Sequence, residues 1–332
     1  MQKRLPAPSA HDVARLAGVS QAAVSRAFTP GASIAVATRD RVIEAAEALG
    51  YRPNLLARSL IMGRTGIVGV VISHPAYPYF FTALDSLSAR LSRAGKHILV
   101  YTAEGPADAR VEDLLKYRID ALLLMAARIS PGMAERCQAA GIPVIAFSAA
   151  REIEGLASVS GDNLGGGAAI ARHLLEQGYR RPAVIGGLED TLTSEEREAG
   201  FVRQLAAEGL AAPQRAVGRF RRAEATLAAR TLLSKTPRPD ALFCANDDMA
   251  LAAIEVARFE FGLEIGRELG VAGFDDIEQA AWPSFDLTSF SLPVETVIGQ
   301  VTDMLFAEPG SVFPANTVVA GALKVRGSTR RG

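Results

Sequence analysis

The sequence has little of what exported and metal-binding proteins display. Cysteine occurs twice in 332 residues, and Cys137 and Cys244 lie in separate apolar contexts without metal-ligand spacing, so we expect buried free thiols and no metal site. No apolar run approaches the ~18–20 residues of a membrane span. Residues 1–8 contain no apolar signal segment. These absences predict a cytoplasmic protein without export or a membrane partner.

Residues that carry enzyme chemistry are equally scarce. The four histidines are scattered, and no HExxH, GxSxG, P-loop or CxxC pattern occurs. Without a nucleophile motif, a metal cluster or a phosphate loop, the sequence predicts no enzyme and no cofactor. An enzyme on an α/β fold with a helical appendage stays open as an alternative, and turnover of a bound sugar would support it.

The charge of the chain is balanced overall but unevenly divided. The formal net charge is zero, yet residues 1–62 contain eight Lys and Arg against four Asp and Glu, which leaves +4 at this end and −4 in the remainder. A small basic segment on a mildly acidic body predicts phosphate binding confined to the N-terminal part.

That N-terminal part contains a helix-turn-helix pattern. Val13, Leu16 and Ala17 have the spacing of one helix face, after a capping box formed by Ser9 and Asp12. Gly18 then provides the left-handed conformation at which many helices end.

A second short helix follows this turn at once. Ser20 can cap it, Val24 and Phe28 would be buried, and the outward positions are Gln21, Ala22, Ser25 and Arg26. A capped second helix behind a glycine turn is typical of proteins that place it in the DNA major groove. An ordinary helical hairpin in a core would give a similar pattern.

The pattern continues into a third helix and an apolar segment. Residues 34–50 predict a helix that buries one side and ends at Gly50; its apolar side holds Val36, Val42, Ile43, Ala46 and Leu49. Asn54 can cap a further helix over 55–62, which is too short to be stable in isolation. The segment 55–62 could become ordered by pairing with a second copy of the chain, by entering the DNA minor groove, or by docking on the core of the three preceding helices.

From Gly66 onward, short apolar runs alternate with amphipathic helices. This rhythm favours parallel sheets covered on both faces, and the length suffices for two of them. The runs are 67–72, 98–101, 121–125, 144–147, 183–185, 241–244 and 271–274, and the intervening helices include 81–94, 165–177, 195–208, 223–234 and 249–261. We expect residues 326–332 to be frayed.

Polar residues follow several of the predicted strands. Ligands of such folds bind at the carboxyl ends of strands, where carboxylates, amides and a guanidinium beside aromatics would suit a small polyhydroxy or heterocyclic molecule. The positions are Ser73, His74, Ser148, Asn246 to Asp248, Asp275 and Asp276, with Arg197 opening a helix and Tyr79, Phe80 or Phe220 nearby. Helix caps and surface turns are the alternative explanation. The glycine-rich stretch 161–167 is interpreted as a turn, with Asp162 or Asn163 capping the next helix.

Taken in order, these motifs resemble those of the LacI/GalR family of bacterial transcriptional regulators along essentially the whole chain. The similarity rests on Asp12-Val-Ala-Arg-Leu-Ala-Gly-Val-Ser20, Val24-Ser-Arg26, Thr38-Arg39, Arg41-Val42, Leu49-Gly-Tyr-Arg-Pro-Asn54, Ala57-Arg-Ser-Leu60, Asp162-Asn163, Arg197 with Ala199-Gly-Phe201, Asn246-Asp-Asp-Met-Ala250 and Gly273-Phe-Asp-Asp276. The headpiece and hinge motifs together are highly specific.

The resemblance implies a homodimer, or a tetramer, that reads a pseudo-palindromic double-stranded operator. Gln21, Ala22 and Arg26 would face base edges, and Ser20 and Ser25 would hold phosphate. Asn54 would open the hinge helix, Ala57 would let paired hinge helices approach closely, and Leu60 would be the minor-groove wedge.

For the body, the resemblance implies an α/β effector domain of the periplasmic-binding-protein type I, with two doubly wound parallel-sheet lobes. The implied division is a small all-α helix-turn-helix headpiece at 1–53, a hinge helix and linker at 54–65, and an effector-binding and dimerisation domain at 66–332, with lobe 1 at about 66–161 and 292–325 and lobe 2 at about 162–291. The cleft would be lined by Ser73, Tyr79, Phe80, Asp162, Thr193, Arg197, Phe220, Asn246 and Asp275.

The sequence departs from the family pattern at three places. Ala35 stands where Ser usually caps the third helix, at a cost on the order of 1 kcal/mol unless Ser33 takes over. Tyr77-Pro-Tyr-Phe80 replaces a more usual Asn-Pro-Phe-Phe, and Ser148-Ala-Ala lacks a charged residue. These changes affect the predicted identity of the ligand. A sugar or sugar derivative is the first candidate class, and a nucleobase or another metabolite is the alternative.

The predicted function is therefore a ligand-responsive transcriptional regulator, with repression as the expected mode. A solute-binding protein of a transporter is the remaining alternative, and it would need an export signal.

Overall fold

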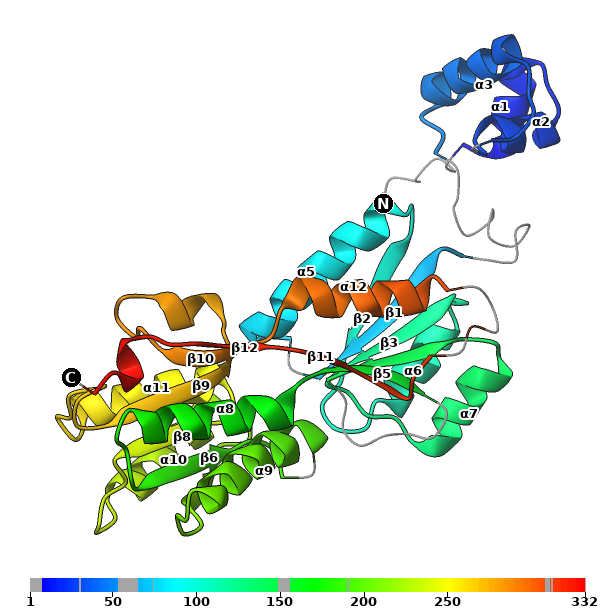
Figure 1. Ribbon diagram of the computed structural model, residues 1–332. Coiled ribbons are helices and arrows are strands. Elements are labelled where there is room, and N and C mark those ends of the chain that lie inside the picture. The colour runs from blue at the N-terminus through cyan, green and yellow to red at the C-terminus, as the bar shows by residue number, and fades with distance from the viewer. Residues whose placement is uncertain are drawn as a thin grey trace, which may run out of the picture. The chain divides into compact units, whose positions relative to one another are not determined.

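The computed structural model describes residues 8–29, 31–52, 65–73, 75–148, 156–189, 191–307, 311 and 313–331. The chain divides into two compact units, Met1–Gly66 and Ile67–Gly332 (Figure 1). Each unit has its own hydrophobic core. Within the described ranges, no helix is long and apolar enough to cross a membrane.

The first unit is a bundle of three helices, α1 (Ala10–Ala17), α2 (Gln21–Ala27) and α3 (Val36–Leu49). Ser9 and Asp12 form the predicted capping box, Gly18 has φ 65° and Gly50 has φ 64°. Ala35 makes no side-chain cap at the start of α3, as the sequence predicts.

The small size of this bundle changes which apolar residues are buried. Val13, Val24 and Val42 fill the core at its centre, whereas Leu16 is 57% and Val36 is 76% exposed. The predictions that both lie on buried helix faces are wrong, as are those for Ile43 and Leu49, which are also exposed. Three helices enclose only one narrow core, so apolar positions at its edge remain in solvent.

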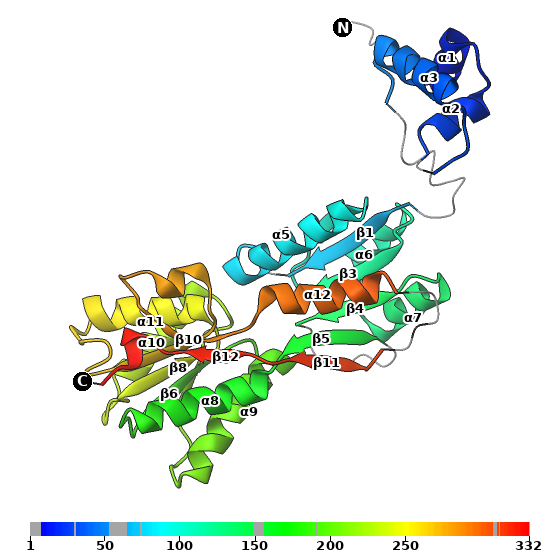
Figure 2. The same ribbon diagram turned by 45° about the horizontal axis from the view of Figure 1, so that its top comes forward.

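The second unit begins with a lobe built on a six-stranded parallel sheet of order β11-β5-β4-β3-β1-β2. Helices α5 and α12 cover one face and α6 and α7 the other, as their separate core clusters show (Figure 2). Its elements are β1 (Ile67–Ile72), α5 (Pro78–Arg93), β2 (His97–Thr102), α6 (Asp108–Leu115), β3 (Ala121–Met125), α7 (Pro131–Ala139), β4 (Val144–Phe147), β5 (Ala157–Gly161), α12 (Val294–Leu305) and β11 (Asn316–Val319).

The other lobe has a sheet of order β12-β10-β9-β8-β6-β7, parallel except where β12 pairs with β10. Its elements are α8 (Asn163–Glu176), β6 (Pro182–Gly186), α9 (Leu192–Ala207), β7 (Gln214–Val217), α10 (Arg222–Leu233), β8 (Ala241–Cys244), α11 (Asp247–Phe259), β9 (Gly270–Asp275), the 3₁₀ turn η1 (Glu278–Ala281), β10 (Thr288–Ser291), β12 (Ala322–Lys324) and the 3₁₀ turn η2 (Gly327–Thr329).

The chain crosses between the lobes three times, after β5, after β10 and after β11. The third crossing corrects the predicted extent of lobe 1. Residues 322–324 were expected there, but β12 pairs with Ser289, Phe290 and Ser291 of β10 and so belongs to lobe 2.

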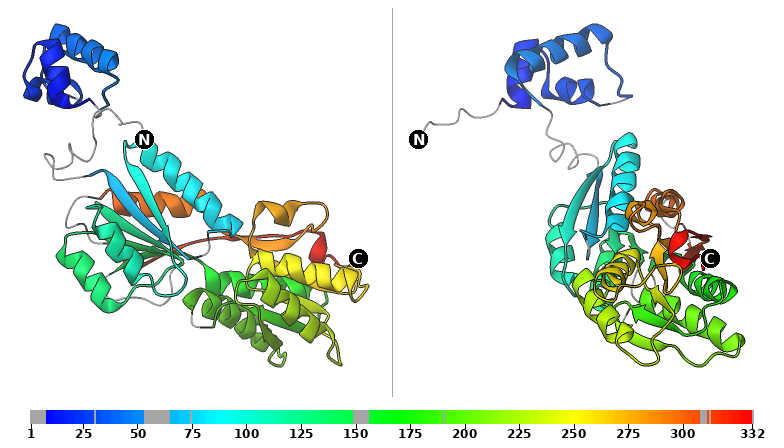
Figure 3. Two further views of the ribbon diagram at one scale, coloured as in Figure 1. Left: turned by 180° about the vertical axis from the view of Figure 1, so that it is seen from behind. Right: turned by 90° about the vertical axis from the view of Figure 1, so that its left-hand side faces the viewer.

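The C-terminal segment is ordered, which contradicts the expected frayed tail. Ser328 and Thr329 are buried, the Ser328 hydroxyl donates to the backbone oxygen of Val271 at 2.6 Å, and Arg326 pairs with Asp276 at 2.7 Å. Figure 3 shows this segment against the second lobe. The polar side chains of the tail are held in place because they form hydrogen bonds with buried groups of lobe 2 that would otherwise lack a partner.

The glycine-rich stretch 161–167 was expected to be a turn, but Gly161 ends β5 and residues 163–167 begin α8, with Asp162 as the helix cap as predicted. Helices α8 and α9 touch through glycines. A Cβ on Gly167 would meet the backbone oxygen of Arg197, and one on Gly200 would meet that of Leu164, both closer than 3.0 Å. This close approach fixes the helix that carries Arg197.

Candidate functional site

The exposed face of α2 is the candidate DNA-reading surface. The burial of Ala23, Val24 and Ala27 turns the other side to solvent, and the exposed residues are Gln21, Ala22, Ser25 and Arg26. A Gln amide and an Arg guanidinium can each make paired hydrogen bonds to a base edge, and Ala offers a methyl group.

Ser20 sits at the N-terminus of this helix. Its Oγ accepts a hydrogen bond from the backbone N–H of Ala23 at 3.2 Å, and the hydroxyl hydrogen remains available to a phosphate oxygen. The hinge positions Asn54, Ala57 and Leu60 lie outside the described residues, so their roles stay predictions.

In the second unit, a pocket lies between the lobes at the carboxyl ends of the strands. It is lined from lobe 1 by Tyr77 and residues of α5 and by the residues after β3 and β4, and from lobe 2 by residues that follow β6, β7 and β8 and by the end of β9. The lining residues are Tyr77, Tyr79, Phe80, Ala126, Ser148, Leu188, Thr191, Thr193, Arg197, Phe220, Asn246 and Asp275.

Most of the residues predicted for the effector come together here. Tyr79, Phe80, Thr193, Arg197, Phe220, Asn246 and Asp275 all line the pocket. Ser73 and Asp162 do not: the Asp162 Oδ1 accepts the backbone N–H of Gly165 at 2.8 Å and thereby caps α8, and the Ser73 N–H pairs with the backbone oxygen of Met125.

The effector prediction omitted five lining residues. Ser148 and Tyr77 stood out in the sequence, as a polar residue after a strand and as a departure from the family pattern. Ala126, Leu188 and Thr191 gave no comparable signal, since small or apolar loop residues acquire a role only through their position.

Four lining residues have left-handed backbones although none is glycine. Ala126 has φ 49°, Ser148 φ 52°, Phe220 φ 58° and Asp275 φ 99°. Such conformations cost about 1–3 kcal/mol each and gather at functional sites, where the surrounding structure enforces them. Their concentration around one pocket makes it the candidate binding site on grounds that do not depend on the sequence motifs.

The polar end of the pocket is a buried ion pair. Arg197 Nη2 lies 2.8 Å from Asp275 Oδ1, with side chains 3% and 4% exposed. Arg197 also donates through Nε to Asn163 Oδ1 at 2.9 Å and through Nη1 to the backbone oxygen of Ala245 at 2.7 Å. Its guanidinium stacks 3.8 Å from the ring centre of Phe274. The ion pair therefore has no net charge, and the Arg197 guanidinium has hydrogen-bond partners for its Nε, Nη1 and Nη2 atoms.

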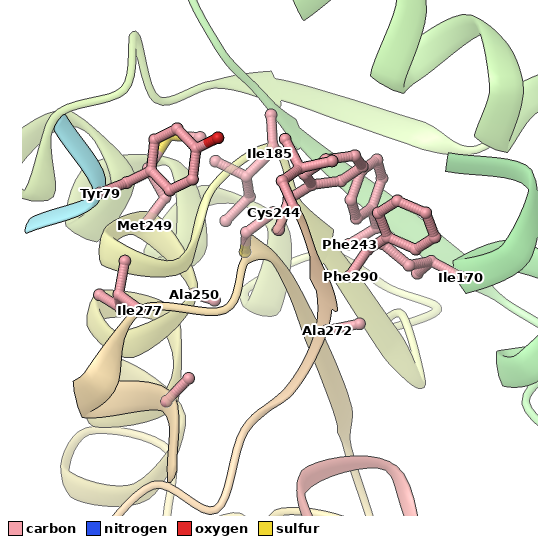
Figure 4. Packing of buried hydrophobic residues seen from close by; sticks show 14 of the residues in the cluster. Tyr79, Ile170, Ile185, Phe243, Cys244, Met249, Ala250, Ala272, Ile277 and Phe290 are labelled. Carbon is pink, nitrogen blue, oxygen red and sulfur yellow. The ribbon is translucent and has the colours of Figure 1, made fainter. Parts of the chain in front are cut away.

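Two neighbouring tyrosines differ sharply in their hydroxyl partners. The Tyr77 hydroxyl donates to Asp275 Oδ2 at 2.6 Å, whereas the buried Tyr79 hydroxyl has no partner among the described residues. Burial, followed by the charge of Asp275, raises the pKa of both phenols, so both remain protonated. Figure 4 shows Tyr79 in the same packed cluster as Met249, Ile185 and Cys244 of lobe 2.

Behind the ion pair, Asp247 is fully buried at the start of α11. Its Oδ1 accepts from the Ser289 hydroxyl at 2.6 Å and its Oδ2 from the backbone N–H of Ile277 at 2.9 Å. Burial first, and then the charge of Asp275, raise the pKa of this carboxyl well above its ordinary value. Asp247 thus positions the loop after β9 and does not line the pocket.

Metal chemistry has no candidate site in the ranges that the structure describes, because no three His, Cys, Asp or Glu side chains gather there in a way that could hold an ion. The pocket instead offers aromatic walls, hydroxyls, an amide and a neutralised ion pair. That lining suits reversible binding of a small molecule.

Comparison with known proteins finds a match for each of the two units. A family model described as bacterial regulatory proteins, lacI family, matches residues 9–54, and a periplasmic binding protein-like domain matches residues 171–329. The HTH-type transcriptional regulator CelR of Thermobifida fusca is 31% identical over 311 residues, which cover 90% of this chain and 91% of that protein. This chain belongs to the LacI family.

Other LacI-family relatives span nearly the whole chain. The HTH-type transcriptional regulator AscG of Escherichia coli is 29% identical over 326 residues, 96% of this chain and 97% of AscG. A structure of a CelR–cellobiose complex has a TM-score of 0.70 at 28% identity and covers 97% of this chain and 99% of that one. The lac repressor dimer bound to operator and the anti-inducer ONPF, at 23% identity, shows the fold, with a TM-score of 0.86 and 97% and 99% coverage.

This LacI-family chain is accordingly a DNA-binding transcriptional regulator with a periplasmic-binding-protein-like body. The predicted family and fold class are confirmed.

Proposed function

We propose that this regulator binds a pseudo-palindromic operator as a homodimer and that a small uncharged effector in the interlobe pocket controls its affinity for DNA. The observation that carries the proposal is the pocket itself, where side chains of both lobes converge and four backbones are held in left-handed conformations. A ligand that contacts both lobes can bind one arrangement of the lobes more tightly than another. It thereby changes the free-energy difference between these arrangements, which is what an allosteric effector must do.

The chemistry of the lining supports an uncharged effector. Arg197 and Asp275 are the two charged residues around the pocket, and they neutralise each other. A charged ligand would be buried without a counter-charge, at a cost of several kcal/mol. A sugar or neutral sugar derivative is our leading class, since hydroxyl and amide groups beside aromatic rings suit polyhydroxy rings; the CelR structure is described as a cellobiose complex.

A nucleobase is the second candidate. Tyr79, Phe80 and Phe220 all face the pocket, and flat heterocycles gain stacking energy from such rings.

For the headpiece we assign residues 1–53, and for the hinge and linker residues 54–65. Gln21, Ala22 and Arg26 read bases, while Ser20 and Ser25 hold phosphate. Asn54 begins a hinge helix. In that helix, Ala57 allows close approach of the hinge helix of the second protomer, and Leu60 enters the minor groove.

The exposed apolar side chains of lobe 1 support pairing of two copies. Phe81 on α5 is 67% exposed and Val100 on the edge strand β2 is 40% exposed. Exposure of these large apolar side chains to water costs free energy, and burial of both between two protomers would remove that cost.

A thermal-shift screen of the full-length protein tests the effector proposal. Cellobiose, glucose, adenine and a sugar phosphate are the probes, because a ligand that binds only the folded state raises the melting temperature. We expect a shift with an uncharged probe that also changes operator affinity in a mobility-shift titration. A shift with the sugar phosphate alone would refute the charge argument.

Leu60→Ala tests the hinge. We expect the variant to lose most of its specific operator affinity while binding to unrelated DNA changes little, because a wedge contributes only where the minor groove opens. Equal losses on both DNAs would contradict the assignment.

A further inference from the structure

The hydrogen bond between Tyr77 and Asp275 joins the two lobes across the pocket. Tyr77 precedes α5 in lobe 1, and Asp275 ends β9 in lobe 2. The phenol oxygen lies 2.6 Å from Asp275 Oδ2. The Tyr77 ring is held in place by an edge-on contact with Phe80 at 5.9 Å between ring centres.

This contact leaves Asp275 without a free oxygen. Its Oδ1 accepts from Arg197 and its Oδ2 from Tyr77. The residue is only 5% exposed, so solvent does not compete for the remaining lone pairs. Each carboxylate oxygen has a second lone pair, but a ligand hydroxyl that approaches Oδ2 from the side of Tyr77 must displace the Tyr77 hydroxyl.

We propose that Tyr77 is a specificity-determining residue that occupies the place on Asp275 that a ligand hydroxyl would take, and so holds the lobes together. The proposal rests on the proposed function only in taking this pocket as the effector site. It predicts that the effector is recognised by the polar groups left over, which include the unpartnered Tyr79 hydroxyl and Ser148.

The two tyrosines provide a matched pair of variants. Tyr77→Phe removes one oxygen atom that bonds across the lobes, and Tyr79→Phe removes one that bonds to nothing in the described structure. Both keep the ring, its aromatic contacts and nearly the same volume. Any difference between them reports on the hydrogen bond.

The first measurement is amide hydrogen exchange of the effector-free, full-length protein. In Tyr77→Phe we expect exchange about tenfold faster in peptides over 75–82 and 274–280, the effect of losing one hydrogen bond to a carboxylate. Strand β6 should keep its protection, and Tyr79→Phe should match the wild type throughout. Unchanged exchange in Tyr77→Phe overturns the proposal. An equal loss of protection in β6 also overturns it, because the hydroxyl would then serve global stability.

The second measurement is calorimetric binding of glucose and cellobiose. With Asp275 released, Tyr77→Phe should bind at least one of them about tenfold more tightly than the wild type, while Tyr79→Phe shows no gain. No gain, or a loss, in Tyr77→Phe overturns the claim about specificity. Operator binding of the same preparations reports on the proposed function separately, since a wild type that binds operator keeps that function whatever Tyr77 does.

Discussion

The buried polar residues Arg197 and Asp247 each have several hydrogen-bond partners within the protein. Arg197 bonds to an amide, a carbonyl and a carboxylate, and Asp247 accepts a hydroxyl and a backbone N–H. Such networks make the removal of one member expensive, because the other is left buried and unpaired. Exposed residues such as Arg26 are free of that constraint and can serve recognition.

Replacement of Arg26 by Ala tests recognition at the residue scale. The side chain is exposed on α2, so we expect folding to be unaffected and base discrimination at one operator position to fall by about 1–3 kcal/mol. Footprinting and titration on the operator and on a point-mutated operator measure this. Arg172→Ala, which removes an exposed arginine of α8 in the other unit, is the control. Retention of full discrimination would exclude Arg26 from base contact.

His173 gives a pH dependence with a definite sign. Its Nε2 lies 2.7 Å from the Thr329 hydroxyl, and burial lowers the pKa of the imidazole below its ordinary value. The folded state then prefers the neutral ring, so the unfolded state binds more protons and stability falls as the pH drops below about 6.5.

The measurement is urea unfolding at about pH 7.5 and about pH 5.5, on either side of this titration. We expect His173→Gln to lose less stability than the wild type between these values, since the uncharged amide does not titrate. Equal pH dependence of the two proteins would show that other groups dominate.

At the scale of elements, the contact of α8 with α9 depends on the absence of side chains. Gly167 and Gly200 let the two helices approach until each glycine faces backbone of the other helix. Arg197 lies one turn before Gly200, so this contact also sets the position of the ion pair. Backbone cannot move aside as a flexible side chain can.

We expect Gly200→Ala to destabilise the protein by about 1–3 kcal/mol through overpacking. Gly132→Ala is the matched control: it also lies in a helix, and a Cβ there meets nothing within 4 Å, so the variant should be neutral or stabilised by up to about 1 kcal/mol. Chemical unfolding of both variants decides the matter. Similar free energies of unfolding for the two would contradict the packing argument.

For the effector domain as a whole, the last strand and tail tie the chain end into lobe 2. Arg326 pairs with Asp276 directly after the pocket residue Asp275, and Ser328 bonds to β9. The chain end is thus coupled to the strand that carries the pocket's carboxylate.

Truncation after Val325 should therefore cost at least about 3 kcal/mol, since several buried groups lose partners worth about 1–3 kcal/mol each. A chain that ends at Thr329 keeps these bonds and should lose much less. Thermal unfolding compares the two. A truncation at 325 that melts with the wild type would show that the tail contributes nothing to the fold.

Local patterns were sufficient wherever a residue's role depends on its neighbours in the chain. The cap at Ser20, the stop at Gly18 and the buried strands such as 121–125 could all be predicted, because capping and strand burial are short-range properties. Strands β5 and β10 were missed, since Ser158, Thr288 and Ser289 read as loop residues and only lateral hydrogen bonds make them strands.

What the sequence determined by itself is the family, most of the helices and buried strands, and most of the residues that meet at the pocket. The tertiary structure alone decided that β12 joins lobe 2, that Gly167 of α8 packs against the backbone of α9, and that Tyr77 reaches Asp275, 198 positions along the chain. The physical reason is that hydrogen bonds and close contacts between distant segments depend on where the backbone brings them. Neither spacing nor composition carries that information.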